Sequence, residues 1–296
     1  MPVTEHDVQL LAALARYYVL TREQLQRICF PGHASGRTTR KRLSKLQKAG
    51  FVRKHRIPVA FPGTCNAAPV YYLTKQAAEL LASWFDDESL LAANTRHPRC
   101  DRLNHWIAVN ETRMVIEQAV TRQDNVTLDG WINEWETVDK DAAEPNRFTL
   151  RSQLSTDPPL SCSPDAAFLL SLGGHRKVYY LEQDLGTSSP KQNAARKTKG
   201  YAALAERQGH RRHFPETTFD TFGVLCITTT SYRCEQTAKY VAKRPRPDLW
   251  LFIDQRELTA ESFLHSSITL NHKLERAPLV KLPAAEPAGT ASGTEQ

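Results

Sequence analysis

The sequence of 296 residues lacks several features that would place the protein in a particular class. No apolar run approaches the roughly 18 residues of a membrane-spanning helix, and charged side chains interrupt the apolar N-terminal segment. The six cysteines include no C-x-x-C pair, which argues against a zinc ribbon and a dense disulfide framework. There is no internal repeat and no glycine-rich phosphate loop. These absences predict a cytoplasmic globular protein with reduced thiols and no membrane partner.

Acidic residues are almost missing from residues 21–60. This stretch holds eleven Lys and Arg side chains and a single acid, Glu23, although the whole chain has a net charge of only +7. The cations therefore outnumber the acids here by more than the excess of the whole chain, and the remainder is slightly acidic. Such a concentration of one sign of charge is typical of a domain that binds a polyanion.

The same N-terminal part has a regular order of predicted elements. Two amphipathic helices come first, and Thr21 with Gln24 three residues later has the spacing of a capping box for the second. A third, strongly basic helix ends at Gly50, and two strand-like runs and a helix follow it. This order predicts a winged helix-turn-helix domain over residues 1–85, followed by a linker over 86–102.

A winged helix-turn-helix places its third helix in the major groove of double-stranded DNA and its wing along the backbone. We expect residues near the start of the third helix to contact bases, and the lysines and the wing to contact phosphates. The predicted DNA contacts are Arg37, Thr38, Thr39, Arg40, Lys41, Lys45, Lys48, Arg53, Lys54 and Arg56. A merely solvated basic face is the alternative, and the concentration of charge favours DNA. A homodimer on two half-sites is a further candidate arrangement.

Residues 103–277 predict a second domain. The order is helix, strand, a polar loop at 137–160, two strands, helix, strand, helix and strand, which belongs to the α+β or α/β class. The two middle strands flank Gly173 and Gly174, a dipeptide typical of a tight hairpin turn. From residue 278 the chain is rich in Ala, Pro, Gly and Thr, which predicts a disordered tail over 278–296.

Three acidic residues lie at the ends of this predicted hairpin. Side chains alternate along a strand, so Glu182 and Asp184 share one face, and normal pairing brings Asp165 of the partner strand close to both. Converging carboxylates repel one another unless a cation or protonation relieves the repulsion. Because oxygen ligands suit hard cations, Mg²⁺ or Mn²⁺ is the predicted cofactor. The alternative is that each acid merely flanks a strand in solvent.

The acids and the αβββαβ order together resemble the PD-(D/E)XK nuclease superfamily. Pro164-Asp165 matches the PD element and Glu182 the following acid, so the resemblance implies that Asp165 and Glu182 hold the metal, which activates water to attack a phosphodiester. Glu136, or Glu134 two residues earlier, is a candidate further ligand. Position 184 departs from the pattern, because Asp184 stands where the superfamily has lysine. Lys197, four residues before a tyrosine on the next helix, is the candidate replacement.

The whole chain resembles the replication-relaxation family of plasmids and integrative elements. The resemblance covers roughly residues 5–255 and rests on the basic winged helix, on "PDAAFLL" and "YYLEQDLGT", and on the Lys/Tyr helix that follows. It implies a restriction-endonuclease-like second domain, a DNA-binding function in replication, relaxation or transfer of mobile DNA, and other mobile-element proteins as candidate partners. A metal-dependent DNA endonuclease with catalytic residues Asp165, Glu182, Asp184 and Lys197 is one hypothesis. A non-catalytic DNA-binding regulator, or an adaptor with a degenerate nuclease-like domain, is the alternative.

Overall fold

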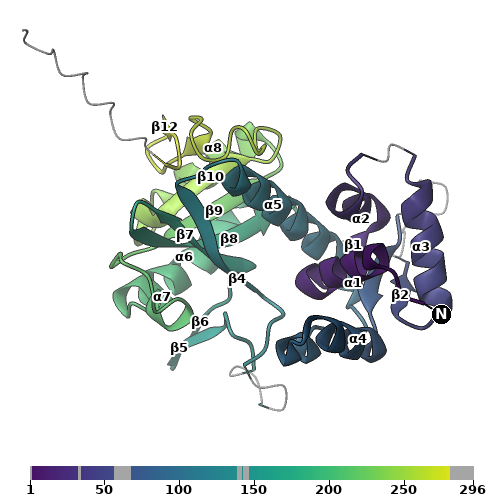
Figure 1. The fold of residues 1–296 in the computed structure, drawn as a ribbon. Helices are drawn as coiled ribbons and strands as arrows, with labels where there is room; N and C mark the ends of the chain where they lie inside the picture. The colour runs from purple at the N-terminus through teal and green to yellow at the C-terminus, as the bar shows by residue number, and fades with distance from the viewer. Residues whose placement is uncertain (1, 33–34, 57–67, 139–141, 143–146, 281–296) are drawn as a thin grey trace, which may run out of the picture. The chain divides into compact units, whose positions relative to one another are not determined.

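A computed structural model describes residues 2–32, 35–56, 68–138, 142 and 147–280 of the chain. The chain divides into two compact units, Met1–Met114 and Val115–Gln296, and the division lies within helix α5 (Leu103–Thr121) (Figure 1). The first turns of α5 belong to the first unit because Asn110 Nδ2 donates hydrogen bonds to the backbone oxygens of Tyr17 and Val19. The predicted boundaries at residues 85 and 103 precede this division.

Besides the first turns of α5, the described part of the first unit contains helices α1 to α4 and a small antiparallel sheet. The strands lie in the order β1-β3-β2, and the helices pack around a core that includes Leu11, Leu14, Leu25, Leu43 and Leu46. The elements are α1 (Glu5–Tyr17), β1 (Leu20–Thr21), α2 (Arg22–Cys29), α3 (Arg37–Lys48), β2 (Val52–His55), β3 (Val70–Leu73) and α4 (Lys75–Phe85).

Local side-chain chemistry explains where helices α2 and α3 begin and end. The predicted capping box is confirmed, since Thr21 Oγ1 accepts from the Gln24 backbone N–H and Gln24 Oε1 from the Thr21 N–H, at 3.1 and 2.9 Å. Helix α3 is followed by Gly50, which has φ +80°, while the Phe51 N–H donates to the Leu46 carbonyl at 3.0 Å. Glycine adopts this left-handed conformation without steric cost, which confirms the predicted stop.

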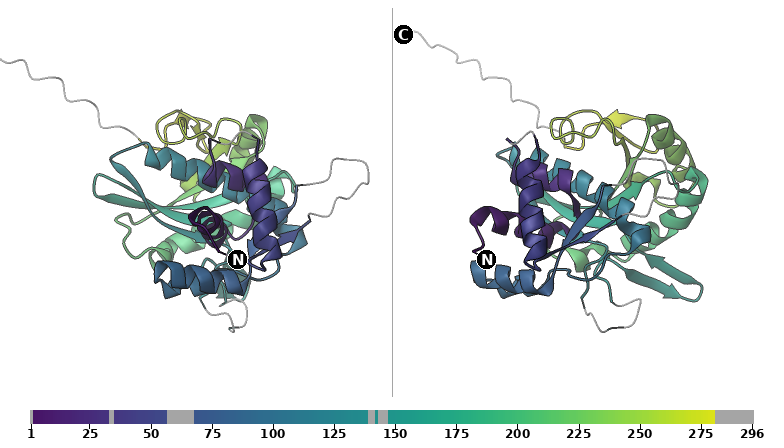
Figure 2. Two further views of the ribbon diagram at one scale, coloured as in Figure 1. Left: turned by 45° about the vertical axis from the view of Figure 1, so that its right-hand side comes forward. Right: turned by 90° about the vertical axis from the view of Figure 1, so that its right-hand side faces the viewer.

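The second unit is built on a seven-stranded mixed sheet in the order β12-β11-β10-β9-β8-β7-β4. Strand β8 pairs antiparallel with β7 and parallel with β9. Hairpin β5–β6 forms a separate two-stranded sheet (Figure 2). The remaining elements are β4 (Val126–Asn133), β5 (Ser152–Thr156), β6 (Pro159–Cys162), β7 (Ala166–Leu172), β8 (His175–Asp184), α6 (Pro190–Glu206), α7 (His210–His213), β9 (Gly223–Thr228), α8 (Ser231–Val241), β10 (Trp250–Asp254), β11 (Thr269–Leu270) and β12 (Arg276–Ala277).

The predicted hairpin of the second unit is confirmed. Leu172 pairs with His175, so the turn consists of Gly173 and Gly174, which have φ values of +54° and +85°. Two consecutive residues with positive φ match the tight turns that follow the twist of paired strands. Tyr180 on β8 and Tyr201 on α6 belong to one buried core, which also contains side chains of α8. Helices α6 and α8 therefore cover the face of the sheet that carries Tyr180.

Several predictions for the second unit were wrong. Strand β5 and the first half of β6 lie in the expected loop at 137–160. Their alternation of apolar and polar residues is too short to be distinguished from a polar loop in the sequence. The first strand ends at Asn133, so Glu134 and Glu136 lie after β4 and not within it. The chain after β10 forms two strands before residue 278 that were not predicted. Within the predicted disordered tail at 278–296, Val280 is buried. The rest of that tail, 281–296, lies outside the described residues.

The expected linker also has structure of its own. Two short 3-10 helices occur within it, η1 (Glu88–Ala92) and η2 (Cys100–Arg102). The side chain of Asp87 accepts a hydrogen bond from the Ser89 backbone N–H at 2.9 Å and so caps the start of η1.

Nowhere among the described residues is a helix both long and apolar enough to cross a membrane.

Candidate active site and nucleic-acid interface

Glu182 is the centre of a buried polar cluster between strand β8 and helix α6. Its Oε2 lies 2.6 Å from Lys197 Nζ, and its Oε1 accepts a hydrogen bond from the Tyr201 hydroxyl, also at 2.6 Å. Lys197 and Tyr201 are four residues apart on α6, so they project from one face of the helix. The predicted approach of Lys197 to the acids is confirmed by this ion pair. The hydrogen bond from Tyr201 to Glu182 was not predicted from the sequence.

Asp165 lies beside Glu182, immediately before strand β7. Its backbone N–H donates to the Leu181 carbonyl at 3.1 Å, and its Oδ2 accepts the Gln183 backbone N–H at 2.8 Å. These two bonds fix the residue against β8 on both sides of Glu182. Asp165 and Glu182 are 7% and 6% exposed, so solvent does little to screen their mutual repulsion.

The charges of this cluster are strongly coupled. Burial raises the pKa of Glu182 above its ordinary value, and the negative charge of Asp165 adds to this, while the Lys197 ammonium opposes it. Burial disfavours the charge of Lys197, but the neighbouring Glu182 and Asp165 raise its pKa overall. Burial and Glu182 also raise the pKa of Tyr201, which therefore stays a hydrogen-bond donor. Lys197 is thus the cation that compensates the two acids.

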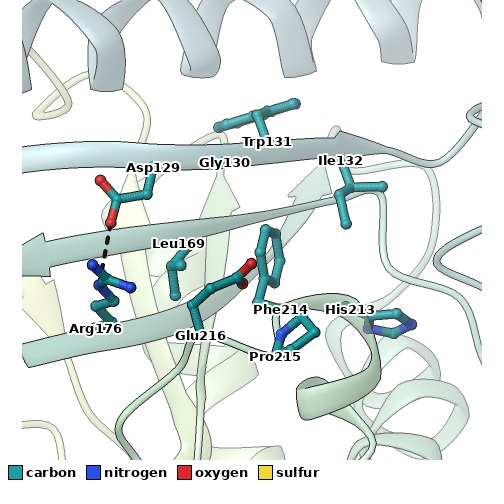
Figure 3. Close-up of a pocket in the computed structure, with 10 residues that line it drawn as sticks. All are labelled: Asp129, Gly130, Trp131, Ile132, Leu169, Arg176, His213, Phe214, Pro215 and Glu216. Atoms are coloured by element: carbon teal, nitrogen blue, oxygen red, sulfur yellow. Dashed lines mark ion pairs between the residues drawn. The ribbon is translucent and has the colours of Figure 1, made fainter.

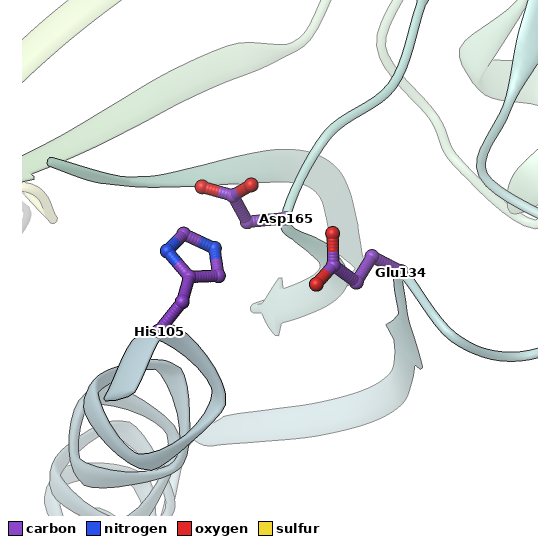
Figure 4. A group of neighbouring side chains, drawn as sticks. All are labelled: His105, Glu134 and Asp165. Carbon is purple, nitrogen blue, oxygen red and sulfur yellow. The ribbon is translucent and has the colours of Figure 1, made fainter. Parts of the chain in front are cut away.

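Glu134 adds a third carboxylate, beside Asp165. It follows strand β4, and its backbone N–H donates to the Asp165 carbonyl at 3.1 Å. Figure 4 shows both side chains, and one carboxylate oxygen of each lies within 4.8 Å of the other. The figure also labels His105, which lies in the part of α5 that belongs to the first unit.

Glu136, the first choice for a further ligand, is placed differently. Its Oε1 accepts hydrogen bonds from the backbone N–H and the Nδ2 of Asn133, at 3.0 and 2.7 Å. The Glu136 carboxylate therefore closes the turn that follows β4. Glu134, the alternative considered with it, is the residue whose carboxylate approaches Asp165.

Asp184 is also placed differently from the prediction. Its two carboxylate oxygens accept hydrogen bonds from Nε and Nη2 of Arg233 on α8, at 2.8 and 2.7 Å. Both side chains are largely buried, with 7% and 14% exposed, and the Gly186 N–H also donates to Asp184. A bidentate pair of this kind directs both oxygens of Asp184 to Arg233, whereas Glu182 is held by Lys197 and Tyr201.

The carboxylates that remain suit a hard divalent cation. Asp165 and Glu134, with one carboxylate oxygen of each within 4.8 Å of the other, offer only oxygen atoms, and so does Glu182 beside Asp165. Carboxylate oxygens are the ligands that Mg²⁺ and Mn²⁺ prefer. The donor set therefore fits the predicted cofactor, with Glu134 in place of Glu136 and without Asp184.

A surface cavity of about 420 Å³ lies elsewhere on the second unit, beside β4 and α7. Ile132, Leu169 and Phe214 line it, and Arg176 Nε and Asp129 Oδ2 lie 3.8 Å apart at its edge (Figure 3). The residues around it include none of the predicted catalytic side chains. The cavity is therefore separate from the acidic cluster.

Helix α3 presents most of its predicted DNA contacts to solvent. Arg37, Arg40, Lys41 and Lys48 are exposed on the helix, and so are Arg53, Lys54 and Arg56 in and after β2. Lys45 is partly exposed, with its Nζ 3.9 Å from Asp7 Oδ2, and Thr38 is half-buried. One predicted base contact is wrong, because Thr39 is completely buried and its hydroxyl donates to Gln26 Oε1. The residues 57–67 between β2 and β3 lie outside the described part of the chain.

Together these features define a two-unit α+β protein with an exposed basic helix in one unit and a buried carboxylate and lysine cluster in the other. A model of the replication-relaxation family matches residues 11–217, and the chain belongs to this family. The matched segment includes α3, Glu134, Asp165, Glu182 and Lys197, and ends before Arg233. No curated protein and no solved structure matches the chain.

Proposed function

We propose that the protein binds double-stranded DNA through its first unit and cleaves a phosphodiester bond in its second unit with the aid of Mg²⁺ or Mn²⁺. Membership of the replication-relaxation family suggests a role in the replication or relaxation of mobile-element DNA. The observation on which the catalytic half of the proposal rests is the 2.6 Å contact between Lys197 Nζ and Glu182 Oε2. Lys197 provides the positive charge that the superfamily pattern has at position 184, where this chain has Asp184.

The order of elements in the second unit supports a restriction-endonuclease-like core. Helix α5 is followed by β4, β7, β8, α6 and β9, which reproduces the αβββαβ order, with hairpin β5–β6 inserted between the first two strands. The strands β4, β7 and β8 are neighbours in the sheet and antiparallel, and β9 joins β8 in parallel. The predicted acids lie at one end of β7 and β8, where α6 begins its approach to the sheet.

Asp165 and Glu182 would hold Mg²⁺ or Mn²⁺, with a further oxygen from Glu134, and the ion would supply an activated water molecule and stabilise negative charge on the phosphate. Lys197 stabilises the charge that develops on the phosphate oxygens during attack. Tyr201 orients Glu182 through its hydrogen bond. Because the site is buried, these charges act in a low dielectric and are more effective than they are in water.

The arrangement of the first unit supports a winged helix-turn-helix. Helices α1, α2 and α3 precede a two-stranded β2–β3 ladder in the chain. The exposed cations of α3 and β2 are suited to phosphate contacts, and Arg37 and Arg40 at the start of α3 are suited to reading bases. The buried Thr39 takes no part in this recognition and holds α3 against α2.

Incubation of supercoiled and linear DNA with the full chain and Mg²⁺ or Mn²⁺ tests the proposal. We expect nicking or cleavage by the wild type and a loss on the order of a hundredfold or more in Asp165→Asn, Glu182→Gln and Lys197→Met. Lys199→Met is the matched control, because Lys199 is an exposed lysine two residues further along α6. No cleavage by the wild type in either metal, with DNA binding intact, would leave the non-catalytic regulator as the function.

One observation favours that second candidate. Both oxygens of Glu182 already have partners within the protein, Lys197 and Tyr201. The Lys197 ammonium therefore balances the charge of Glu182 without a metal ion. A site that had lost its metal could keep this arrangement as a structural ion pair. Calorimetric titration of the wild type with Mn²⁺ separates the two candidates, because only the catalytic one requires binding that Asp165→Asn abolishes.

A further inference from the structure

The Lys197 ammonium has two features that distinguish it from a permanently buried counter-ion. Its side chain is 24% exposed, three times the 8% of the Glu182 side chain that it contacts. Its second acceptor, the Ser163 backbone oxygen, is at 3.4 Å, close to the outer limit of a hydrogen bond. The ammonium is therefore held chiefly by Glu182, on a side chain that is partly exposed.

Glu182, in contrast, has a second and independent attachment. The Tyr201 hydroxyl is buried and donates to Oε1, whereas Lys197 contacts Oε2. If the ammonium leaves, Tyr201 still holds the carboxylate in the same place, with Oε2 directed to the vacated side. The carboxylate thus has one fixed and one exchangeable partner.

We propose that Lys197 is an exchangeable counter-ion of Glu182: it compensates the carboxylate until a divalent cation binds beside Asp165, and is then released toward solvent and the DNA backbone. The inference rests on the proposed function to the extent that it assumes a cation site at these carboxylates. It adds that metal binding and release of Lys197 are one coupled event. The released ammonium becomes available to a phosphate oxygen only when the metal is present.

The physical reason is the cost of placing like charges together. A divalent cation and an ammonium beside the same buried carboxylate repel each other in a medium that screens poorly. The ion with more carboxylate ligands stays, and the singly charged ammonium on a flexible four-carbon chain moves. Binding of the cation and binding of the ammonium to Glu182 are therefore mutually antagonistic, and this antagonism is reciprocal.

Amine modification of the wild-type protein tests the release directly. The full chain is treated with an amine-reactive acetylating reagent at limiting dose, with and without saturating Mg²⁺, and acetylation at each lysine is quantified by mass spectrometry. We expect Mg²⁺ to increase the modification of Lys197 about tenfold, because release from Glu182 exposes the amine to the reagent. Lys199, an exposed lysine two residues further along α6, is the internal control, and Mg²⁺ should not change its acetylation.

A second arm measures Mn²⁺ affinity by calorimetry in wild type, Lys197→Met, Lys197→Gln and Tyr201→Phe. We expect both Lys197 variants to bind Mn²⁺ about tenfold more tightly, since no ammonium must be displaced. Tyr201→Phe keeps the ammonium and should show no such gain. The neutral Gln variant keeps the measurement possible if the Met variant does not fold.

The outcomes separate this inference from the proposed function. Cleavage by the wild type, together with Lys197 modification that Mg²⁺ leaves unchanged or slows, overturns the inference and leaves the function standing. Absence of both cleavage and Mn²⁺ binding in the wild type overturns the function and the inference with it. Increased Lys197 modification with tighter Mn²⁺ binding by both Lys197 variants establishes the exchange.

Discussion

The reassignment of Asp184 from metal ligand to partner of Arg233 can be tested by a single substitution. In Asp184→Asn the side chain keeps its shape and loses its charge, so the Arg233 guanidinium remains largely buried with only the Ser188 backbone oxygen and one amide oxygen as acceptors. We expect the variant to unfold more easily than the wild type and to bind Mn²⁺ with unchanged affinity.

The magnitude follows from the burial of the pair. Removing one partner of a buried ion pair typically costs about 3–5 kcal/mol, because the other charge is left uncompensated. Asp184 and Arg233 are 7% and 14% exposed, and the remaining Ser188 contact relieves part of the penalty. We therefore expect the free energy of unfolding to fall by about 3 kcal/mol.

Urea unfolding at neutral pH and Mn²⁺ calorimetry are the two assays. Asp220→Asn is the control for stability, since its ion pair with Arg211 is exposed and should contribute less than about 1 kcal/mol. Asp184→Leu combined with Arg233→Met should recover most of the loss, because an apolar pair leaves no buried charge. A fall in Mn²⁺ affinity in Asp184→Asn comparable to that in Asp165→Asn, with stability unchanged, would refute the assignment.

Two further predictions concern DNA binding and pH. Replacing Arg40 and Lys41 by Glu should abolish DNA binding, whereas Lys243→Glu in the second unit should change the affinity little. A wild-type DNA affinity that does not fall as the salt concentration rises would contradict the phosphate contacts. Burial lowers the pKa of His213 from 6.5 to about 4, so the neutral ring stabilises the fold above pH 6.5 and this stability is lost as the pH falls toward 4. His213→Gln should reduce the loss of unfolding free energy between pH 7 and pH 4 by about 3 kcal/mol, and His175→Gln at an exposed position should not. An equal loss in the wild type and in His213→Gln would contradict this.

Interactions between residues close in the chain were the most predictable from the sequence. The capping box at Thr21, the stop at Gly50 and the turn at Gly173 depend on contacts within a few residues, and the structure has all three. Lys197 could also be predicted, because its spacing from Tyr201 places both side chains on the helix face that meets the sheet. Such predictions succeed because backbone geometry alone determines which side chains share a face.

The errors arose where the partner of a side chain lies far along the chain. Asp184 and Arg233 are separated by 49 positions, and no periodic pattern indicates that α8 directs a cation at the end of β8. Thr39 was expected to face DNA because it lies in a basic stretch, but Gln26 on the preceding helix accepts its hydroxyl and explains its burial. In both cases one buried polar contact, which the local sequence does not reveal, decides the role of the residue.

The two charge changes around β8 are physically connected. An aspartate at position 184, on the same strand as Glu182, adds a negative charge near two buried acids, and it is tolerated here because Arg233 neutralises it with two hydrogen bonds. Arg233 thereby leaves the repulsion between Asp165 and Glu182 to be relieved by another cation, and Lys197 provides it from α6. A lysine on a strand has a direction set by the sheet, whereas one on a helix beside the sheet can reach Glu182 and still swing outward. The position of Lys197 on α6 therefore provides the positive charge beside Glu182 and is compatible with the proposed exchange.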